Sequence, residues 1–183
     1  MPPDKGRLHR FRISWALALS MSVLSGVVLT GSAAAQSTDT GITGTPEVLD
    51  ADILKFGTQR VLLWGIDAPE KKQTCQLNGQ LWGCYDVAFR YLQLLSGRGE
   101  VTCTYKGDPD PFGRRFGVCV SGGEDLNAEM VRAGMALAYD EESEDYDAAM
   151  VEAITAAVGL WQPGANFEEP WVFRRRETPG GFR

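Results

Sequence analysis

The sequence predicts an α+β domain in which helices pack on the outside of a small β-barrel. The first observation is the order of patterns along the chain: three strand-like runs, a helix, two more strand-like runs and two further helices. The second is length. The chain has 183 residues, and the 148 that follow the first 35 contain no internal repeat and suffice for one domain with a core.

The first 35 residues have the features of a secretory signal peptide. Four basic residues precede the apolar stretch WALALSMSVLSGVVL, and three alanines ending at Ala35 follow it. The stretch is short and interrupted by serines, so cleavage after Ala35 is predicted; an uncleaved membrane anchor is the alternative. The mature protein is therefore expected to be periplasmic or secreted, without stable membrane association, and to begin with a flexible segment over residues 36–44.

The charge of the mature chain excludes a general nucleic-acid coat protein. Of 18 basic and 24 acidic residues, four basic and one acidic lie in the first 35, which leaves 14 and 23 and a formal charge of −9. Unspecific phosphate binding depends on an excess of lysine and arginine. The only histidine, His9, also lies in the signal segment. The mature chain therefore cannot build a Ser-His-Asp triad, a Cys-His pair or a histidine-ligated zinc site.

Three strand-like runs open the domain, which is expected to span residues 45–172. They cover residues 45–50, 52–56 and 59–66, and Gly57 marks the turn between the last two. A helix is then predicted within residues 77–99, because apolar residues recur there at spacings of four and three and a glycine follows them. These apolar residues are Leu81, Tyr85, Ala88, Leu92 and Leu95.

The second half of the domain is predicted to begin with a hairpin. Its strands cover residues 100–107 and 114–120 and flank a turn rich in proline and glycine. A helix over 125–134, a short extended piece over 135–139 and a helix over 143–159 follow. Residues 173–183, which are rich in arginine, are expected to form a basic, flexible tail.

The four cysteines all lie in the mature chain and are expected to pair, because an exported chain meets an oxidising compartment. Cys103 and Cys119 lie nearly equidistant from the centre of the predicted hairpin turn, so they are predicted to face each other. Cys75 and Cys84 would then close a short loop. Free thiols or a metal cluster are the alternative, although the spacings lack the Cys-x-x-Cys pairs of zinc sites.

Acidic residues gather around the first three strands. Asp50 and Asp52 are predicted to point the same way, because alternate side chains of a strand share a face. Asp67 and Glu70 lie where the third strand stops. If neighbouring strands bring Asp52 near Asp67, two carboxylates and a backbone carbonyl suit a hard cation such as Ca²⁺. The alternative is that these acids only form turns.

Four motifs together resemble the staphylococcal nuclease (thermonuclease) family, and in particular its exported bacterial members with KQTC and paired cysteines. They are VLDADIL, RVLLWGIDAPE, FGR and DLNAEMVRAGMALAY, in the family's order and at its distances. The resemblance implies a five-stranded OB-type β-barrel with three helices. It also implies a calcium-dependent phosphodiesterase, with one weakly bound ion, that acts on DNA or RNA. A monomer is expected.

The resemblance assigns a role to each matching position. Asp52 and Asp67, with the backbone carbonyl of Ala68, match the calcium ligands of the family. Glu70 would orient or deprotonate the attacking water, and Arg114 of FGR would bind the phosphate and stabilise the leaving oxygen. Asp50 is an accessory candidate beside these residues.

The chain departs from the family pattern at several of these positions. Leu62 stands where the family has its other catalytic arginine, so reduced activity is expected. Arg60 lies two residues earlier on the same strand face and is an accessory candidate. Its Cα atom is, however, displaced along the strand by about 7 Å from that of residue 62. Ala51 and Ile53 replace a glycine and a threonine near the metal ligands.

A second acidic run covers residues 140–147, near where the family's site has its rim. It would repel a polyanion there; the alternative is that it is the solvated start of the last helix. Together with Leu62, the run supports the alternative function, a catalytically silent binding or scaffold module of the cell envelope. The sequence does not distinguish DNA from RNA as the substrate, or internal from terminal cleavage.

Overall fold

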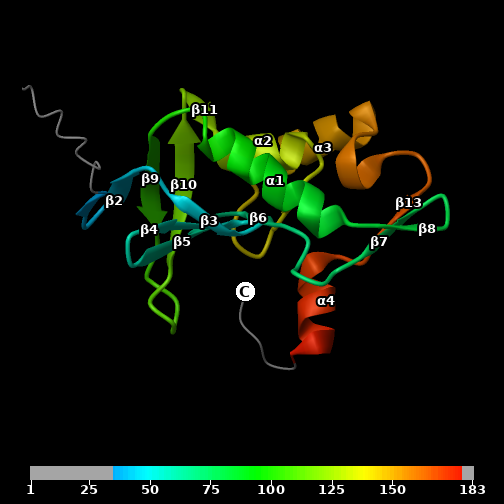
Figure 1. Ribbon diagram of the computed structural model, residues 1–183, viewed down its shortest axis with the longest axis horizontal. Helices are drawn as coiled ribbons and strands as arrows, with labels where there is room; N and C mark the ends of the chain where they lie inside the picture. Colours follow the sequence, from blue (N-terminus) through cyan, green and yellow to red (C-terminus); the bar gives the residue numbers. More distant parts are fainter. Residues whose placement is uncertain (1–34, 179–183) are drawn as a thin grey trace, which may run out of the picture. The chain divides into compact units, whose positions relative to one another are not determined.

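The central sheet is built from strands that lie far apart in the sequence (Figure 1). The computed structural model describes residues 35–178, which lie within one unit spanning Ser32–Arg183. The predicted signal peptide, apart from Ala35, lies outside the described residues. The strand order is β1-β2-β9-β10-β5-β4-β3, with β11 beside β10. The strands are β1 (Gln36–Thr38), β2 (Gly41–Gly44), β3 (Glu47–Asp50), β4 (Ile53–Phe56), β5 (Gln59–Leu63), β9 (Val101–Lys106), β10 (Arg115–Ser121) and β11 (Glu124–Asp125).

Two strands from opposite parts of this sheet, β2 and β3, follow each other in the chain. β2 pairs with β9 and β3 pairs with β4, yet only Thr45 and Pro46 separate β2 from β3. Pro46 has no N–H to give to a ladder, which explains a break in the strand at this point. The sheet therefore curves until its ends approach each other, as in an OB-type barrel whose first strand is split. The predicted fold class is confirmed.

Residues 36–44 form strands β1 and β2, whereas the sequence predicted a flexible segment. β1 and β2 are antiparallel partners, and β2 also runs beside β9, where Ile42 stands opposite Cys103. Ile42 is buried in the core. The pairing joins residues that are far apart in the sequence, so the local composition of 36–44 gave no sign of it.

The helix predicted within residues 77–99 begins later than expected. α1 covers Cys84–Ser96, and its residues Ala88, Leu92 and Leu95 are fully buried, as the spacing predicted. Leu81 instead lies in a hairpin of β7 (Cys75–Leu77) and β8 (Gln80–Trp82), and 77 % of it is exposed. The hairpin turns at Asn78 and Gly79, both of which have positive φ, as a tight two-residue turn requires.

Four α-helices occur in residues 35–178, one more than the resemblance implied. The others are α2 (Leu126–Arg132), α3 (Asp147–Ala156) and α4 (Pro170–Glu177), and a 3₁₀ turn covers Gly159–Trp161. None of the helices described is long and apolar enough to cross a membrane. Two small sheets pair β6 (Ile66–Asp67) with β12 (Leu137–Ala138), and β7 with β8 and β13 (Ala165–Asn166).

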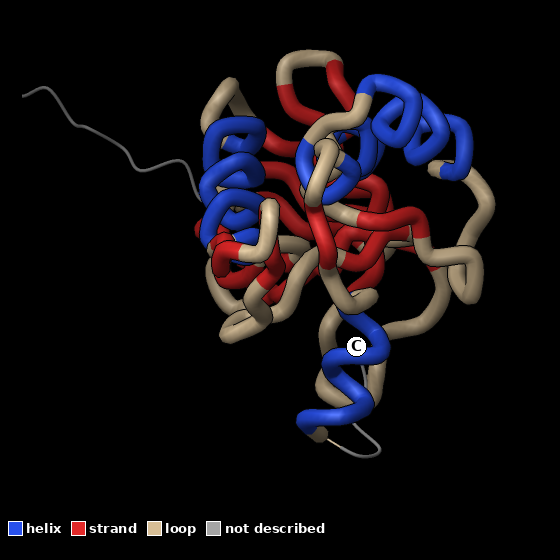
Figure 2. The backbone as a smooth tube through the Cα atoms, turned by 90° about the vertical axis from the view of Figure 1, so that its right-hand side faces the viewer, coloured by secondary structure: helices blue, strands red, loops and turns tan. Residues whose placement is uncertain are grey.

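α4 differs from the expected tail, because residues 173–177 are helical. Pro170 occupies the first turn of α4, where its missing N–H costs no hydrogen bond. α4 lies at the bottom of the molecule in both views, apart from α1, α2 and α3 (Figure 2). Residues 179–183 of the predicted tail lie outside the described part of the chain.

Both predicted disulfides are present, and the pairing of the cysteines is confirmed. Cys75 of β7 is bonded to Cys84, the first residue of α1. Cys103 and Cys119 stand directly opposite each other on β9 and β10, with their Cα atoms 4.0 Å apart. Both members of this second pair are fully buried in the core.

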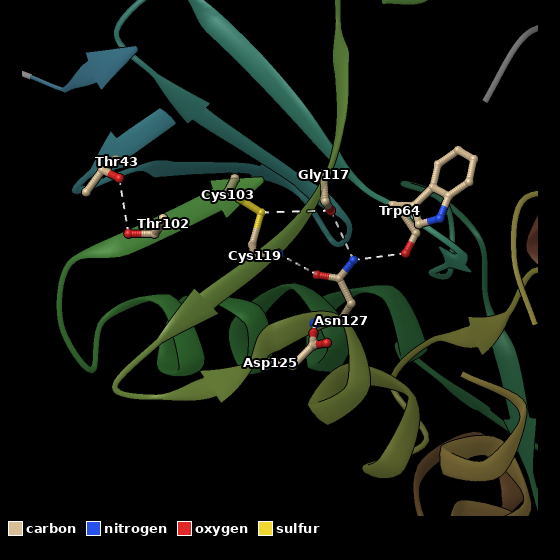
Figure 3. Close-up of a disulfide and its surroundings, with 8 residues drawn as sticks. All are labelled: Thr43, Trp64, Thr102, Cys103, Gly117, Cys119, Asp125 and Asn127. Atoms are coloured by element: carbon tan, nitrogen blue, oxygen red, sulfur yellow. Dashed lines mark hydrogen bonds between the residues drawn. A yellow bond between two sulfur atoms is a disulfide. The ribbon is translucent and has the colours of Figure 1, made fainter. Parts of the chain in front are cut away.

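Asn127 of α2 lies beside the Cys103–Cys119 bond and joins three elements (Figure 3). Its Nδ2 donates to the carbonyl oxygens of Trp64, at 2.9 Å, and Gly117, at 3.1 Å. Its Oδ1 accepts from the backbone N–H of Cys119 at 3.1 Å. Since Trp64 lies in the turn between β5 and β6, Asn127 holds that turn, and the start of β6, against β10.

Removing the Cys103–Cys119 bond is expected to lower the free energy of unfolding by about 3 kcal/mol, because the bond closes a loop of about 15 residues in the unfolded chain. The measurement is urea unfolding of the Cys103→Ala, Cys119→Ala variant. Cys75→Ala, Cys84→Ala is the matched control and should lose less, since its cysteines are only 9 residues apart. Equal losses in the two variants would contradict the loop-length argument.

Candidate active site

Strands β4 and β5 of the central sheet contribute to one small cavity, and β10 lies beside β5. Ile53 of β4 stands opposite Leu62 of β5, and Leu62 stands beside Phe116 of β10 in the parallel pair. The backbone N–H of Leu63 donates to the carbonyl of Asp52 at 2.9 Å, which fixes the turn before β4 against the end of β5. The cavity has a volume of about 120 Å³. It is lined by Asp50, Asp52, Ile53, Leu62, Ala68, Pro69, Glu70, Arg114 and Arg174.

Asp50 and Asp52 reach the cavity from a turn, not from one continuous strand as the sequence predicted. Asp50 ends β3 and is paired with Ile53, so Ala51 and Asp52 form the turn between β3 and β4. Asp50 accepts a hydrogen bond from the N–H of Ala51 at 2.9 Å. Ala51 is buried in the core, which accounts for a small residue here. Burial, and then the charge of Asp50 and its hydrogen bond, raise the pKa of Tyr85 to about 12.

Asp67 is fully buried next to the cavity, on β6. The short pairing of β6 with β12, in which Asp67 stands opposite Leu137, fixes its backbone. Its carboxylate receives a forked contact from Arg174 of α4: Nη2 lies 2.8 Å from Oδ2 and Nη1 lies 3.2 Å from Oδ1. A buried carboxylate needs a cationic or hydrogen-bonding partner, and Arg174 provides both.

Glu70 lies on the proline-containing loop after β6 and shares Arg174 with Asp67. Nη1 of Arg174 donates to Oε1 of Glu70. Burial raises the pKa of Glu70 above its ordinary value. The charge and hydrogen bond of Arg174 oppose this rise, and the charges of Asp67 and Asp50 add to it.

Gln73, the glutamine of KQTC, holds the Glu70 loop in place. It is buried, and its Oε1 accepts from the N–H of Glu70 at 2.9 Å while its own N–H donates to the carbonyl of Glu70 at 2.7 Å. Its Nε2 donates to the carbonyl of Glu168 at 2.6 Å. Because Glu168 precedes α4, Gln73 ties the Glu70 loop to the segment that carries Arg174.

Arg114 enters the cavity from the turn before β10, and Asp110 positions it. The Oδ1 of Asp110 accepts from the N–H of Phe112 at 2.9 Å and from that of Arg114 at 2.8 Å. Its Oδ2 accepts from Nε of Arg114. Burial by itself would raise the pKa of Asp110, but the hydrogen bonds and charge of Arg114 outweigh it, so that the pKa lies below its ordinary value.

Asp110→Asn is expected to reduce the free energy of unfolding by about 1–2 kcal/mol at neutral pH, because it removes a charge-assisted pair. The folded-state pKa of Asp110 is depressed below 3.8, so its contribution is present above the unfolded pKa and is lost as pH falls through the folded one. Urea unfolding at about pH 7 and about pH 2.5 tests this. A stability difference that stays constant between the two pH values would contradict it.

The other predicted site residues divide into those that reach the cavity and those that do not. Ala68 is buried and lines it, as does Leu62, which is only 1 % exposed. Arg60 is exposed on β5, opposite Lys55 of β4, and it is absent from the residues that line the cavity. Arg60 therefore precedes Val61, the partner of Arg115, but it does not contribute to the cavity wall.

The residues around the cavity fit a hard cation in the kind of donor they offer. The donor set that the sequence predicted contains two carboxylates, Asp52 and Asp67, and the carbonyl of Ala68, all of them oxygen atoms on buried residues. Within residues 35–178, no three acidic, cysteine or histidine residues form a ready-made metal cluster. The guanidinium of Arg174 shows that the carboxylate of Asp67 attracts a cation.

The acidic run at 140–147 is partly structural. Glu142 accepts from the N–H of Gly65 at 2.9 Å, and Glu141 accepts from the hydroxyl of Tyr139 at 2.6 Å. Gly65 has a φ of +72° and lies against Tyr146, so the turn before β6 has little room for a side chain. Glu142 therefore helps to fix the turn that leads to Asp67.

A larger cavity of about 520 Å³ is lined in part by the two residues of β12. Apolar and aromatic side chains form most of its wall, with acidic residues at 140, 141 and 169. Trp171 of α4 packs against Tyr139 with ring centroids 5.3 Å apart, and Trp161 packs edge-on against Phe167 at 5.3 Å. Helix α4 thus contributes to both cavities.

Comparison with known proteins gives a consistent result. The family model described as staphylococcal nuclease homologue matches residues 60–163. A micrococcal nuclease from Shigella flexneri is 36% identical over 177 residues, which is 87% of this chain and 94% of its own. An uncharacterized endonuclease from Escherichia coli O157:H7 is 34% identical over 137 residues, 71% of this chain and 82% of its own. The succinoglycan biosynthesis protein ExoI from Rhizobium meliloti (strain 1021) is 29% identical over 145 residues, 77% of this chain and 74% of its own.

Proposed function

Because the chain belongs to the staphylococcal nuclease homologue family, we propose that it is an exported nuclease that hydrolyses phosphodiester bonds of DNA or RNA with the help of one weakly bound calcium ion. The observation that carries the proposal is the single cavity in which Glu70 and Arg114 lie together with Asp50 and Asp52. The two disulfides support export, since such bonds persist in oxidising compartments.

In the proposed reaction, Glu70 takes a proton from a water molecule whose oxygen attacks phosphorus. The bond between phosphorus and the leaving ester oxygen breaks, and that oxygen takes up a proton from solvent. Arg114 offers a planar fork to the phosphate oxygens and stabilises the charge that develops on them. A calcium ion bound by Asp52, Asp67 and the carbonyl of Ala68 would offset the phosphate charge.

The proposed activity is reduced relative to family members with an arginine at the position of Leu62. A buried leucine offers no hydrogen-bond donor to a phosphate. Removal of one preorganised donor for a developing oxyanion typically slows a reaction by about 10²–10³. Of the two arginines that the family pattern places at the phosphate, this chain keeps only Arg114, so slow cleavage is the expected result.

The test is cleavage of DNA and of RNA by the purified exported protein, with calcium and with a chelator. Slow, calcium-dependent cleavage of either polymer is expected, at low salt so that repulsion from the acidic surface is not confused with slow chemistry. No cleavage of either polymer under any of these conditions would remove the proposal. It would favour the second candidate, a binding or scaffold module of the cell envelope, which Leu62 and the acidic run at 140–147 support.

Calorimetry with millimolar calcium is expected to show one weak binding event, because a site with few protein ligands suits a partly hydrated cation. The variant Asp52→Ala, Asp67→Ala should show no such event. Glu100→Ala, Asp108→Ala is the matched control, since it removes two exposed carboxylates outside the cavity. Undiminished heat in the Asp52, Asp67 variant would remove the metal site from these residues.

A further inference from the structure

Helix α4 inserts an arginine into the candidate active site. Arg174 lines the same cavity as Leu62, Glu70 and Arg114, and its side chain is 13 % exposed. The family match covers residues 60–163, so α4 lies beyond it. None of the roles that the resemblance assigned falls on this helix.

The position of Arg174 is fixed by contacts other than its own ion pairs. Gln73 binds the carbonyl of Glu168, just before the helix, and Pro170 is buried. One turn before Arg174, Trp171 packs on Tyr139. The neighbours Arg175 and Arg176 are exposed. Of these three consecutive arginines, therefore, the fold directs one into the cavity.

The ion pairs keep Arg174 charged in this buried place. Burial by itself would lower its pKa, but the hydrogen bonds and charges of Asp67 and Glu70 raise the pKa above its ordinary value. A guanidinium has five N–H donors, and each carboxylate oxygen has more than one lone pair. Arg174 can therefore release one donor to an incoming phosphate while it remains bonded to Asp67.

We propose that Arg174 is the second phosphate-binding arginine of this site, and that α4 supplies the guanidinium that β5 lacks at Leu62. The inference rests on the proposed function, because it assigns a further residue to the same reaction. A phosphate held over the cavity would meet Arg114 from the turn before β10 and Arg174 from α4. The planar guanidinium groups of the two arginines would then both donate hydrogen bonds to the phosphate oxygens. Arginine suits this geometry better than lysine, because its donors lie in one plane.

The competing explanation is that Arg174 only neutralises the buried charge of Asp67. Both explanations predict that Arg174→Met loses stability, because it leaves a buried carboxylate without its cation. They differ in what happens to phosphate binding and to a compensating arginine on β5, and calcium binding separates both of them from a general loss of structure. The experiment is therefore designed around these three readouts, with urea unfolding to identify variants that are not folded.

The first arm compares Arg174→Met, Arg174→Lys and the control Arg175→Met in the complete exported protein. Arg175 is an exposed arginine on the same helix and carries the same charge. Binding is measured in calcium with a labelled DNA octamer whose linkages are phosphorothioates, so that hydrolysis is slow. Arg174→Met should weaken binding about tenfold and slow cleavage of ordinary DNA by about 10²–10³. Arg174→Lys should fall between, and Arg175→Met should stay within about twofold of wild type.

The same variants are titrated with calcium alone. Removal of a cation from beside Asp67 leaves uncompensated negative charge, so Arg174→Met should bind calcium about tenfold more tightly even though it cleaves DNA more slowly. General loss of structure would weaken both. Calcium affinity that falls together with the cleavage rate would therefore count against the proposal.

The second arm places an arginine on β5. Leu62→Arg should restore most of the cleavage that Arg174→Met loses, and it should add little to the wild-type protein, whose second guanidinium is already present. A hundredfold gain from Leu62→Arg in wild type would overturn the proposal, whether or not Arg174→Met folds. Unchanged binding and cleavage in Arg174→Met would overturn it as well.

A failure of the proposed function has a separate signature. If the wild-type protein and all variants fail to cleave, but octamer binding still depends on Arg174 and not on Arg175, Arg174 remains a phosphate ligand and hydrolysis is excluded. If binding is also independent of Arg174, both proposals fail.

Discussion

Replacement of Arg114 by methionine is expected to slow phosphodiester cleavage by about 10³-fold or more. An arginine that stabilises charge on a transferring phosphoryl group is worth about 10³–10⁵ in rate. Methionine keeps most of the apolar stem of arginine but has no donors. The turn should survive this change in part, because Asp110 also accepts hydrogen bonds from the backbone of residues 112 and 114.

The measurement is the cleavage rate of a labelled oligonucleotide in calcium at low salt, with unfolding in urea as the check on folding. Arg115→Met is the matched control. Arg115 is the next residue, but its guanidinium stacks over the ring of Tyr105 at 4.4 Å and donates to the carbonyl of Asp39 at 3.1 Å. It does not line the cavity. Similar losses of rate in the two variants would show that Arg114 has no special role.

Glu70→Gln is expected to slow cleavage by about 10²–10⁴, because an amide cannot take a proton from the attacking water. The amide oxygen can still accept the hydrogen bond from Arg174, and the backbone bonds of residue 70 to Gln73 do not involve its side chain. Loss of rate with little loss of stability is therefore the expected combination.

The matched control for this second substitution is Glu100→Gln, which changes an exposed glutamate outside the cavity in the same way. Binding of the phosphorothioate octamer should be similar in the control and in Glu70→Gln. If Glu70→Gln retained more than a tenth of the wild-type rate, Glu70 would not be the general base.

The succession of strands along the chain and the buried face of α1 could be predicted, because both depend on local patterns. Strand-like runs bounded by turn residues marked β4, β5, β9 and β10, and spacings of three and four marked the buried residues of α1. Leu81 was misassigned because it lies four residues before Tyr85 and so continues the helical spacing by coincidence. The Asn78-Gly79 pair was the local signal for a hairpin instead.

The candidate site could be predicted only where its residues lie in recognisable motifs. Asp52, Asp67, Glu70 and Arg114 were found in this way, whereas Arg174 was not. Its bonds join α4 to residues more than 100 positions earlier, and no local rule identifies which of three consecutive arginines turns inward. The spacing of three from Trp171 was the available signal, since it places both side chains on one side of a helix.

The split first strand has a consequence for how the protein folds. Before the sheet can curve onto itself, β2 must pair with β9, and β10 must pair in parallel with β5. The contacts that define the domain therefore join segments about 50–60 residues apart. Domains dominated by such distant pairings have a high contact order and fold in milliseconds to seconds, more slowly than helical bundles. The cavity draws on β4, β5, the turn before β10 and α4, so no early intermediate limited to neighbouring segments contains it. Its residues come together only as the whole domain crosses its folding barrier.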